Sequence, residues 1–100
     1  MPPKDVDITL ENRTPQAAPD SVNLSKNQGN TILWHNKTGN DIVITFNNGT
    51  PFNGHPHPYT IKSGQKEPSG PVTANAGTTW SYTISVVGGA AADPQVIVEP

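Results

Sequence analysis

The chain has 100 residues, of which 32% are hydrophobic and 14% are charged, and it contains no cysteine. A chain of this length supports one compact domain with a single core, so we expect one domain over residues 1–100. The formal net charge of -2 and the scattered lysines argue against a nucleic-acid partner. We also expect no membrane insertion, because no apolar stretch approaches the roughly 20 residues that a spanning helix needs.

Short runs of alternating apolar and polar residues predict β-strands, and no helical periodicity of useful length is present. In chain order we expect strands at residues 6–10, 21–25, 30–36, 41–46, 59–62, 71–74, 79–85 and 95–99, with the first at a sheet edge. Residues 11–20 contain two prolines and are predicted to be a loop or a crossover, and residues 37–40 are predicted to turn a hairpin. The pattern predicts an all-β fold, a two-sheet antiparallel Greek-key sandwich of about seven or eight strands. Trp34, Phe46, Trp80, Tyr82 and Ile84 are the expected core residues.

The C-terminal part of the chain has a distinctive order of residues. Trp80, Tyr82 and Ile84 alternate with serine and threonine, and a bend at residues 87–94 leads into the apolar run 95–98. In outline this segment resembles the last hairpin of the cupredoxins, the blue-copper family. There a Tyr-rich strand ends in a cysteine, a loop carries a histidine and a methionine, and a Val-rich strand closes the sandwich. Residues 22–36, with an inward Trp34 and Asn36 at the exit, resemble the second and third strands of that family.

The resemblance implies that the copper ligands are missing. Aligned without gaps, Ile84 falls at the family's copper cysteine, Val87 at its second histidine and Ala92 at its axial methionine, while Asn40 occupies the slot of the upstream histidine. An alternative alignment places residues 77–84 on the preceding strand and shortens the ligand loop instead. A blue-copper site needs a thiolate and two imidazoles, so a chain without cysteine cannot build one, and we expect no cofactor.

Residues 47–58 contain two Asn-Gly pairs and three prolines, which predict a long irregular loop with Asn53 and Tyr59 among its presented residues. His55 and His57 flank Pro56 in this loop. Imidazoles two residues apart in an extended chain can lie on one side and are good ligands for Cu(II) or Zn(II). The competing interpretation is that both are solvated loop residues.

We expect no enzymatic activity, because the chain has no cysteine nucleophile, no Gly-x-Ser-x-Gly motif and no evident pair of acids.

The first hypothesis is a copper-free, cupredoxin-like binding module that is not a redox carrier. It would present loops 47–58 and 87–94 to an unknown protein or small ligand, as a monomer or weak oligomer. One alternative is a weak Cu(II) or Zn(II) carrier that uses His55 and His57, and another is a structural or adhesin-like subunit. We expect a periplasmic or secreted location if a leader peptide has been removed, and otherwise assign no compartment.

Overall fold

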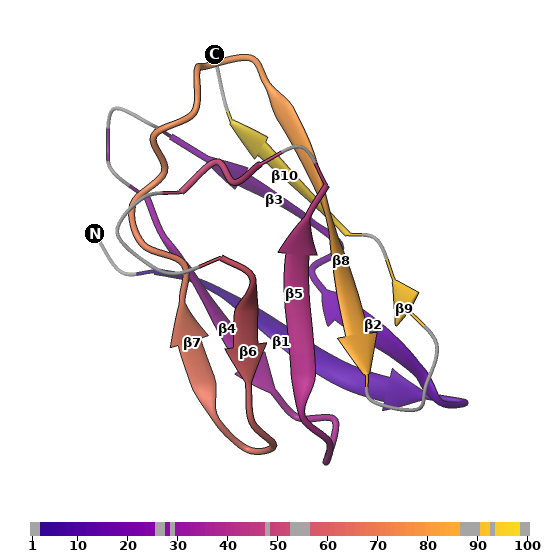
Figure 1. Cartoon of the computed structure of the whole chain (residues 1–100). Coiled ribbons are helices and arrows are strands. Elements are labelled where there is room, and N and C mark those ends of the chain that lie inside the picture. The colour runs from indigo at the N-terminus through magenta and orange to yellow at the C-terminus, as the bar shows by residue number, and fades with distance from the viewer. Residues whose placement is uncertain are drawn as a thin grey trace.

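The structure is a computed structural model that describes residues 3–25, 28, 30–47, 49–52, 57–86, 91–92 and 94–98. Within these residues the chain forms ten strands and packs them as a sandwich of two sheets (Figure 1). The strands are β1 (Lys4–Glu11), β2 (Thr14–Ala18), β3 (Ser21–Leu24), β4 (Ile32–Asn36), β5 (Ile42–Phe46), β6 (Tyr59–Ile61), β7 (Lys66–Pro68), β8 (Thr79–Val86), β9 (Ala91–Ala92) and β10 (Gln95–Val98).

One sheet has four strands in the order β2-β1-β4-β7. The other has six strands, with the order β3-β10-β8-β5-β6 and with β9 paired to β8. The predicted all-β sandwich is therefore confirmed, but its sheets are mixed. β1 pairs with β4 in parallel and β10 pairs with β3 in parallel, whereas the other pairs are antiparallel.

Several predicted elements differ from the structure. The first strand lies inside its sheet, between β2 and β4, and not at an edge. Residues 11–20 are not a loop, because β2 forms there and pairs with β1 despite Pro15, which is compatible with an edge strand. Residues 37–40 do not turn a hairpin within one sheet, because β4 and β5 belong to different sheets and this segment passes between them.

The middle of the chain also departs from the prediction. Residues 71–74 form no strand and contribute a single bridge between Val72 and Phe52. The edge strand β7 was not predicted, because its residues Lys66, Glu67 and Pro68 lack an apolar alternation. β7 is instead defined by its backbone pairing with β4.

The core lies between the two sheets and is centred on Trp34, whose side chain is fully buried. Its ring lies 4.9 Å from that of Tyr59 and 5.7 Å from that of Tyr82, measured between centroids. The indole Nε1 donates a hydrogen bond of 3.3 Å to the Tyr82 hydroxyl, which satisfies a polar group inside the core. Phe46 and Ile84 are buried as expected, whereas Trp80 is only partly buried at the margin of the core. No helix in the described part of the chain has the length and hydropathy needed to cross a membrane.

Candidate functional site

The turn between β4 and β5 is held by the buried side chain of Asn36. Its Nδ2 donates to the carbonyl oxygens of Asn40, at 2.7 Å, and Ile61, at 2.9 Å. Its Oδ1 accepts from the backbone N–H of Thr38 at 3.1 Å and from the Thr38 hydroxyl at 2.7 Å. A carboxamide has two donor hydrogens and two acceptor lone pairs, so Asn36 uses its full capacity. The side chain therefore joins the start of β5 to the end of β6.

Asn40 is an exposed residue of this turn. Its backbone N–H donates to the Thr38 hydroxyl at 3.1 Å, and its carbonyl oxygen accepts from Asn36 Nδ2 and lies 2.9 Å from the same hydroxyl, whose one hydrogen it shares with Asn36 Oδ1. The structure thus gives Asn40 a backbone role in the turn. Its side chain makes one long hydrogen bond, of 3.5 Å, to the Thr38 carbonyl oxygen.

Ile84 is a core residue with no exposed surface. It lies on β8 opposite Ile44 of β5 on one side and opposite Ala92 of β9 on the other. The neighbouring pair, Ile42 opposite Val86, is also buried. The structure therefore places Ile84 and Ala92 side by side, while Asn40 precedes the paired part of β5 by two residues. Val87 lies outside the described residues.

His57 is positioned by the end of β5. Its Nε2 lies 2.7 Å from the backbone nitrogen of Phe46 and accepts a hydrogen bond from that N–H. Its ring centroid is 5.9 Å from that of Phe46 and 6.1 Å from that of Tyr59. An imidazole nitrogen accepts only when it carries no proton, so this hydrogen bond assigns the ring proton to Nδ1. A metal ion on Nε2 would have to displace the Phe46 hydrogen bond. His55 lies outside the described residues.

The prediction that Tyr59 is a presented loop residue is wrong. Tyr59 begins β6, is 3% exposed and donates a hydrogen bond of 2.8 Å from its hydroxyl to the Ser69 carbonyl oxygen. Burial raises the pKa of Tyr59, the negative charge of Glu67 adds to this, and a hydrogen bond with Thr50 opposes it. The aromatic ring is a core group because the chain re-enters the sandwich immediately after Pro58. Asn53, the other residue expected on this surface, lies outside the described residues.

The sequence matches no family model and no curated protein. The structure is similar to a solved purple cupredoxin from Nitrosopumilus maritimus, with a TM-score of 0.65 and 12% identity over 96% of this chain and 99% of that chain. The chain has a cupredoxin fold. It is also similar to a variant of the multicopper oxidase McoA from Aquifex aeolicus, with a TM-score of 0.51 and 19% identity, covering 97% of this chain and 27% of that chain. At these identities the likeness shows the fold alone.

The residues that the ungapped sequence alignment sets against the cupredoxin ligands do not fit a copper ion. Ile84 and Ala92 offer no nitrogen, oxygen or sulfur atom in their side chains, and Asn40 offers only a carboxamide. The described part of the chain contains no group of three or more His, Cys, Asp or Glu side chains placed to hold a metal ion. Ile84, the residue that the ungapped alignment sets against the copper cysteine, is a hydrocarbon side chain that packs in the core.

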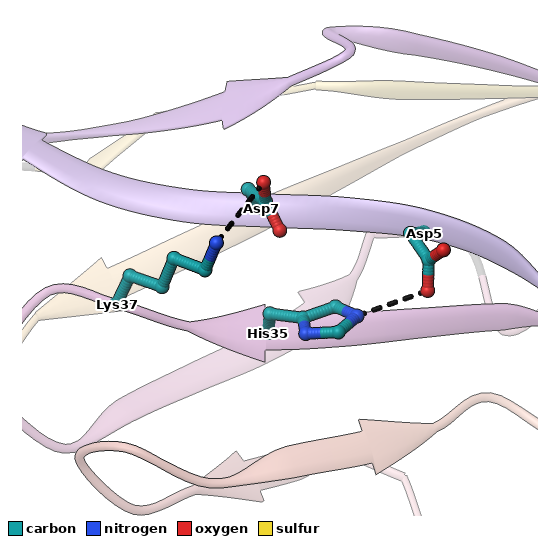
Figure 2. A network of polar contacts seen from close by, with 4 residues as sticks. All are labelled: Asp5, Asp7, His35 and Lys37. Atoms are coloured by element: carbon teal, nitrogen blue, oxygen red, sulfur yellow. Dashed lines mark hydrogen bonds and ion pairs between the residues drawn. The ribbon is translucent and has the colours of Figure 1, made fainter.

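A separate set of polar contacts lies on the outer face of β1 and of β4 with the residue that follows it (Figure 2). His35 Nε2 lies 2.9 Å from Asp5 Oδ1, and Lys37 Nζ lies 3.3 Å from Asp7 Oδ2. The two pairs join neighbouring parallel strands. The Asp5, Asp7 and Lys37 side chains are between 44% and 63% exposed, so each pair adds at most about 1 kcal/mol to the stability of the sheet.

Neither His35 nor Asp41, the side chains that could add a donor to a metal site at His57, contacts that residue in the described structure. His35 is paired with Asp5 on the outer face of its sheet, whereas His57 packs on the core residues Phe46 and Tyr59. Asp41 Oδ1 accepts a hydrogen bond of 3.1 Å from the backbone N–H of Ser63. The described chain therefore supplies His57 with no third ligand from these positions.

Sequence reasoning missed a cleft of about 370 Å³ at the corner where β2 leads into β3 and β9 leads into β10. Its lining comes from segments far apart in the chain, and it consists of Pro15, Gln16, Asp20, Ser21, Ala92, Pro94 and Gln95. No motif could have revealed it, because the crossing from one sheet to the other brings these residues together.

Proposed function

We propose that this chain is a copper-free domain of cupredoxin fold that works as a binding or interaction module and not as a redox carrier or an enzyme. The observation that carries the proposal is the burial of Ile84 between Ile44 and Ala92. A blue-copper centre depends on a thiolate ligand, and the alignment sets Ile84 against the residue that supplies it. An isoleucine at that position leaves the scaffold without its redox group. Such scaffolds commonly carry recognition on the loops and edges that they hold in place.

Two further observations support this proposal. The Asn36 side chain fixes the turn at Asn40, so this end of the sandwich is rigid without any metal. The match to 27% of the multicopper oxidase chain indicates that a unit of this fold also occurs as one part of a longer protein. Both features suit a module whose role is to hold a surface in a fixed shape.

Calorimetric titration with Cu(II) and with Zn(II) tests the proposal against the metal-carrier alternative. We expect no tight one-to-one binding of either ion to the wild type in a non-chelating buffer, because His57 Nε2 already accepts the Phe46 N–H. The variants are His55→Ala combined with His57→Ala, and His35→Ala as a matched control on another face. Circular dichroism verifies that each variant is folded. Stoichiometric binding that is lost in the double variant and kept in the control would establish a metal carrier instead.

A further inference from the structure

The cleft at the β2 and β10 corner has a rigid frame. Gln16 belongs to β2, while Ser21 of β3 and Gln95 of β10 are direct partners in the parallel ladder. The backbone N–H of Gln95 donates a hydrogen bond of 2.9 Å to the carbonyl oxygen of Asp20. β2 also packs against β9, which carries Ala92. The backbone that carries the polar residues around the cleft therefore belongs to strands, or lies next to one, and needs little ordering when a ligand binds.

The lining of the cleft divides into an apolar floor and a polar rim. Pro15 and Pro94 are buried and Ala92 is partly buried, whereas Gln16 and Gln95 are exposed at the rim. The rim also contains the Ser21 hydroxyl and the Asp20 carboxylate. A volume of about 370 Å³ lies at the lower end of the usual range for small-ligand sites, which is roughly 300–1,000 Å³. The cleft thus admits one side chain or a small molecule.

The charge of the rim selects the class of ligand. Asp20 is the one ionisable residue among the described lining residues, and no lysine or arginine is present among them. The ion pairs of the described chain involve Asp5 and Asp7 and leave Asp20 unpaired in that part of the molecule. The charge of Asp20 also contributes, after burial, to a Tyr82 pKa of about 12, although the hydrogen bond with Trp34 lowers it. A carboxylate without an ion-pair partner among the described residues, in a cleft that two glutamines also line, favours a cation with several N–H donors and disfavours an anion.

We propose that this cleft binds the guanidinium group of an arginine side chain on a partner protein. A guanidinium presents five N–H donors in one plane, so it can pair with the Asp20 carboxylate and still donate to the Gln16 and Gln95 carbonyl oxygens. Its apolar stem packs on the floor formed by Pro15 and Pro94. The described lining residues include no aromatic ring on which a sugar could stack. The inference rests on the proposed function, because it assigns one recognition group to the interaction module.

An NMR titration tests this assignment with short blocked peptides. The probes are acetyl-Gly-Arg-Gly-amide, the same peptide with citrulline, which is uncharged and nearly isosteric with arginine, and the same peptide with lysine. We expect saturable amide shifts centred on Gln16, Ser21 and Gln95 with the arginine peptide. Asp20→Asn should weaken its binding about tenfold, because a hydrogen-bonded charge pair is lost. Asp41→Asn makes the same charge change at the start of β5 and should leave the affinity unchanged.

Each contrary outcome overturns the proposal. Absence of saturable shifts, equal binding of the citrulline peptide, or equal loss in Asp41→Asn would show that no charge-specific site exists in the cleft. Equal binding of the lysine peptide would show that the cleft takes any cation and does not select a guanidinium. These readouts are independent of the metal titration. A negative peptide titration would overturn the arginine site but not the copper-free module, whereas tight metal binding would overturn the module and not the peptide result.

Discussion

Replacing Trp34 with alanine is expected to destabilise the protein by about 3–5 kcal/mol, the usual range for removing a large aromatic side chain from a core. The indole is fully buried and contacts the rings of Phe46, Phe52, Tyr59 and Tyr82. Its removal leaves a cavity between the two sheets and takes away the hydrogen-bond partner of the Tyr82 hydroxyl. Since domains of this kind are stable by only about 5–15 kcal/mol, this is a large fraction of the total. Urea unfolding followed by far-UV circular dichroism measures the loss.

The matched control for this prediction is Trp80→Ala. Trp80 is only partly buried, and its Nε1 donates to the Thr78 hydroxyl at 3.0 Å at the margin of the core. We expect this substitution to cost about 1–2 kcal/mol, within the ordinary range for single substitutions. If the two substitutions were equally damaging, Trp34 would not be the centre of the core that the structure places there.

The substitution Asn36→Asp is expected to destabilise the protein by about 3 kcal/mol or more at neutral pH, because it leaves an uncompensated charge in a buried site. The amide Nδ2 donates to the carbonyl oxygens of Asn40 and Ile61, and a carboxylate oxygen in its place would repel both. A protonated acid can still donate one hydrogen bond, so the penalty should shrink as the pH falls. The free acid ionises near pH 4 in an unfolded chain, and burial raises that value in the folded one. The loss in free energy of unfolding caused by Asn36→Asp should therefore grow as the pH rises above about 4.

Asn40→Asp is the control for this second prediction. It makes the same chemical change four residues later, at an exposed side chain whose contact is a 3.5 Å hydrogen bond to Thr38. We expect its effect to stay within about 0.5 kcal/mol at both pH 4 and pH 7. Chemical denaturation of both variants at the two pH values provides the comparison. A small, pH-independent effect of Asn36→Asp would contradict the hydrogen-bond network assigned to the turn.

Alternation of apolar residues predicted the strands that face the core. Ile42, Ile44 and Phe46 are buried as expected, and so is Trp34 on β4. The pattern works there because one face of each strand is covered by the other sheet. It failed for β7, which pairs with β4 through its backbone and carries mostly exposed side chains. The strand predicted at residues 59–62 is present as β6, whereas the separate expectation that Tyr59 is presented with the preceding loop is wrong, because its side chain is buried.

The pairing of strands and the cleft could not be predicted from the sequence. A side-chain period of two is the same in parallel and antiparallel strands, so nothing in Val6 or Trp34 indicated that β1 and β4 run parallel. The chain crosses between the sheets at the corner of β2 and β3, and only this crossing brings Gln16, Asp20 and Gln95 to one cleft. The absence of cysteine was evident from composition alone, whereas the burial of Ile84 required the structure.

The central claim is that the copper position of the cupredoxin fold is an apolar part of the core in this chain. Paramagnetic broadening of ¹H–¹⁵N spectra by equimolar Cu(II) tests it most directly, because it locates any bound ion whether or not the site is coloured. We expect the amide signals of Asn40, Ile84 and Ala92 to keep their intensity, with any weak broadening confined to the surroundings of histidines. Selective loss of the Ile84 and Ala92 signals would place a copper ion at this end of the sandwich and contradict the account.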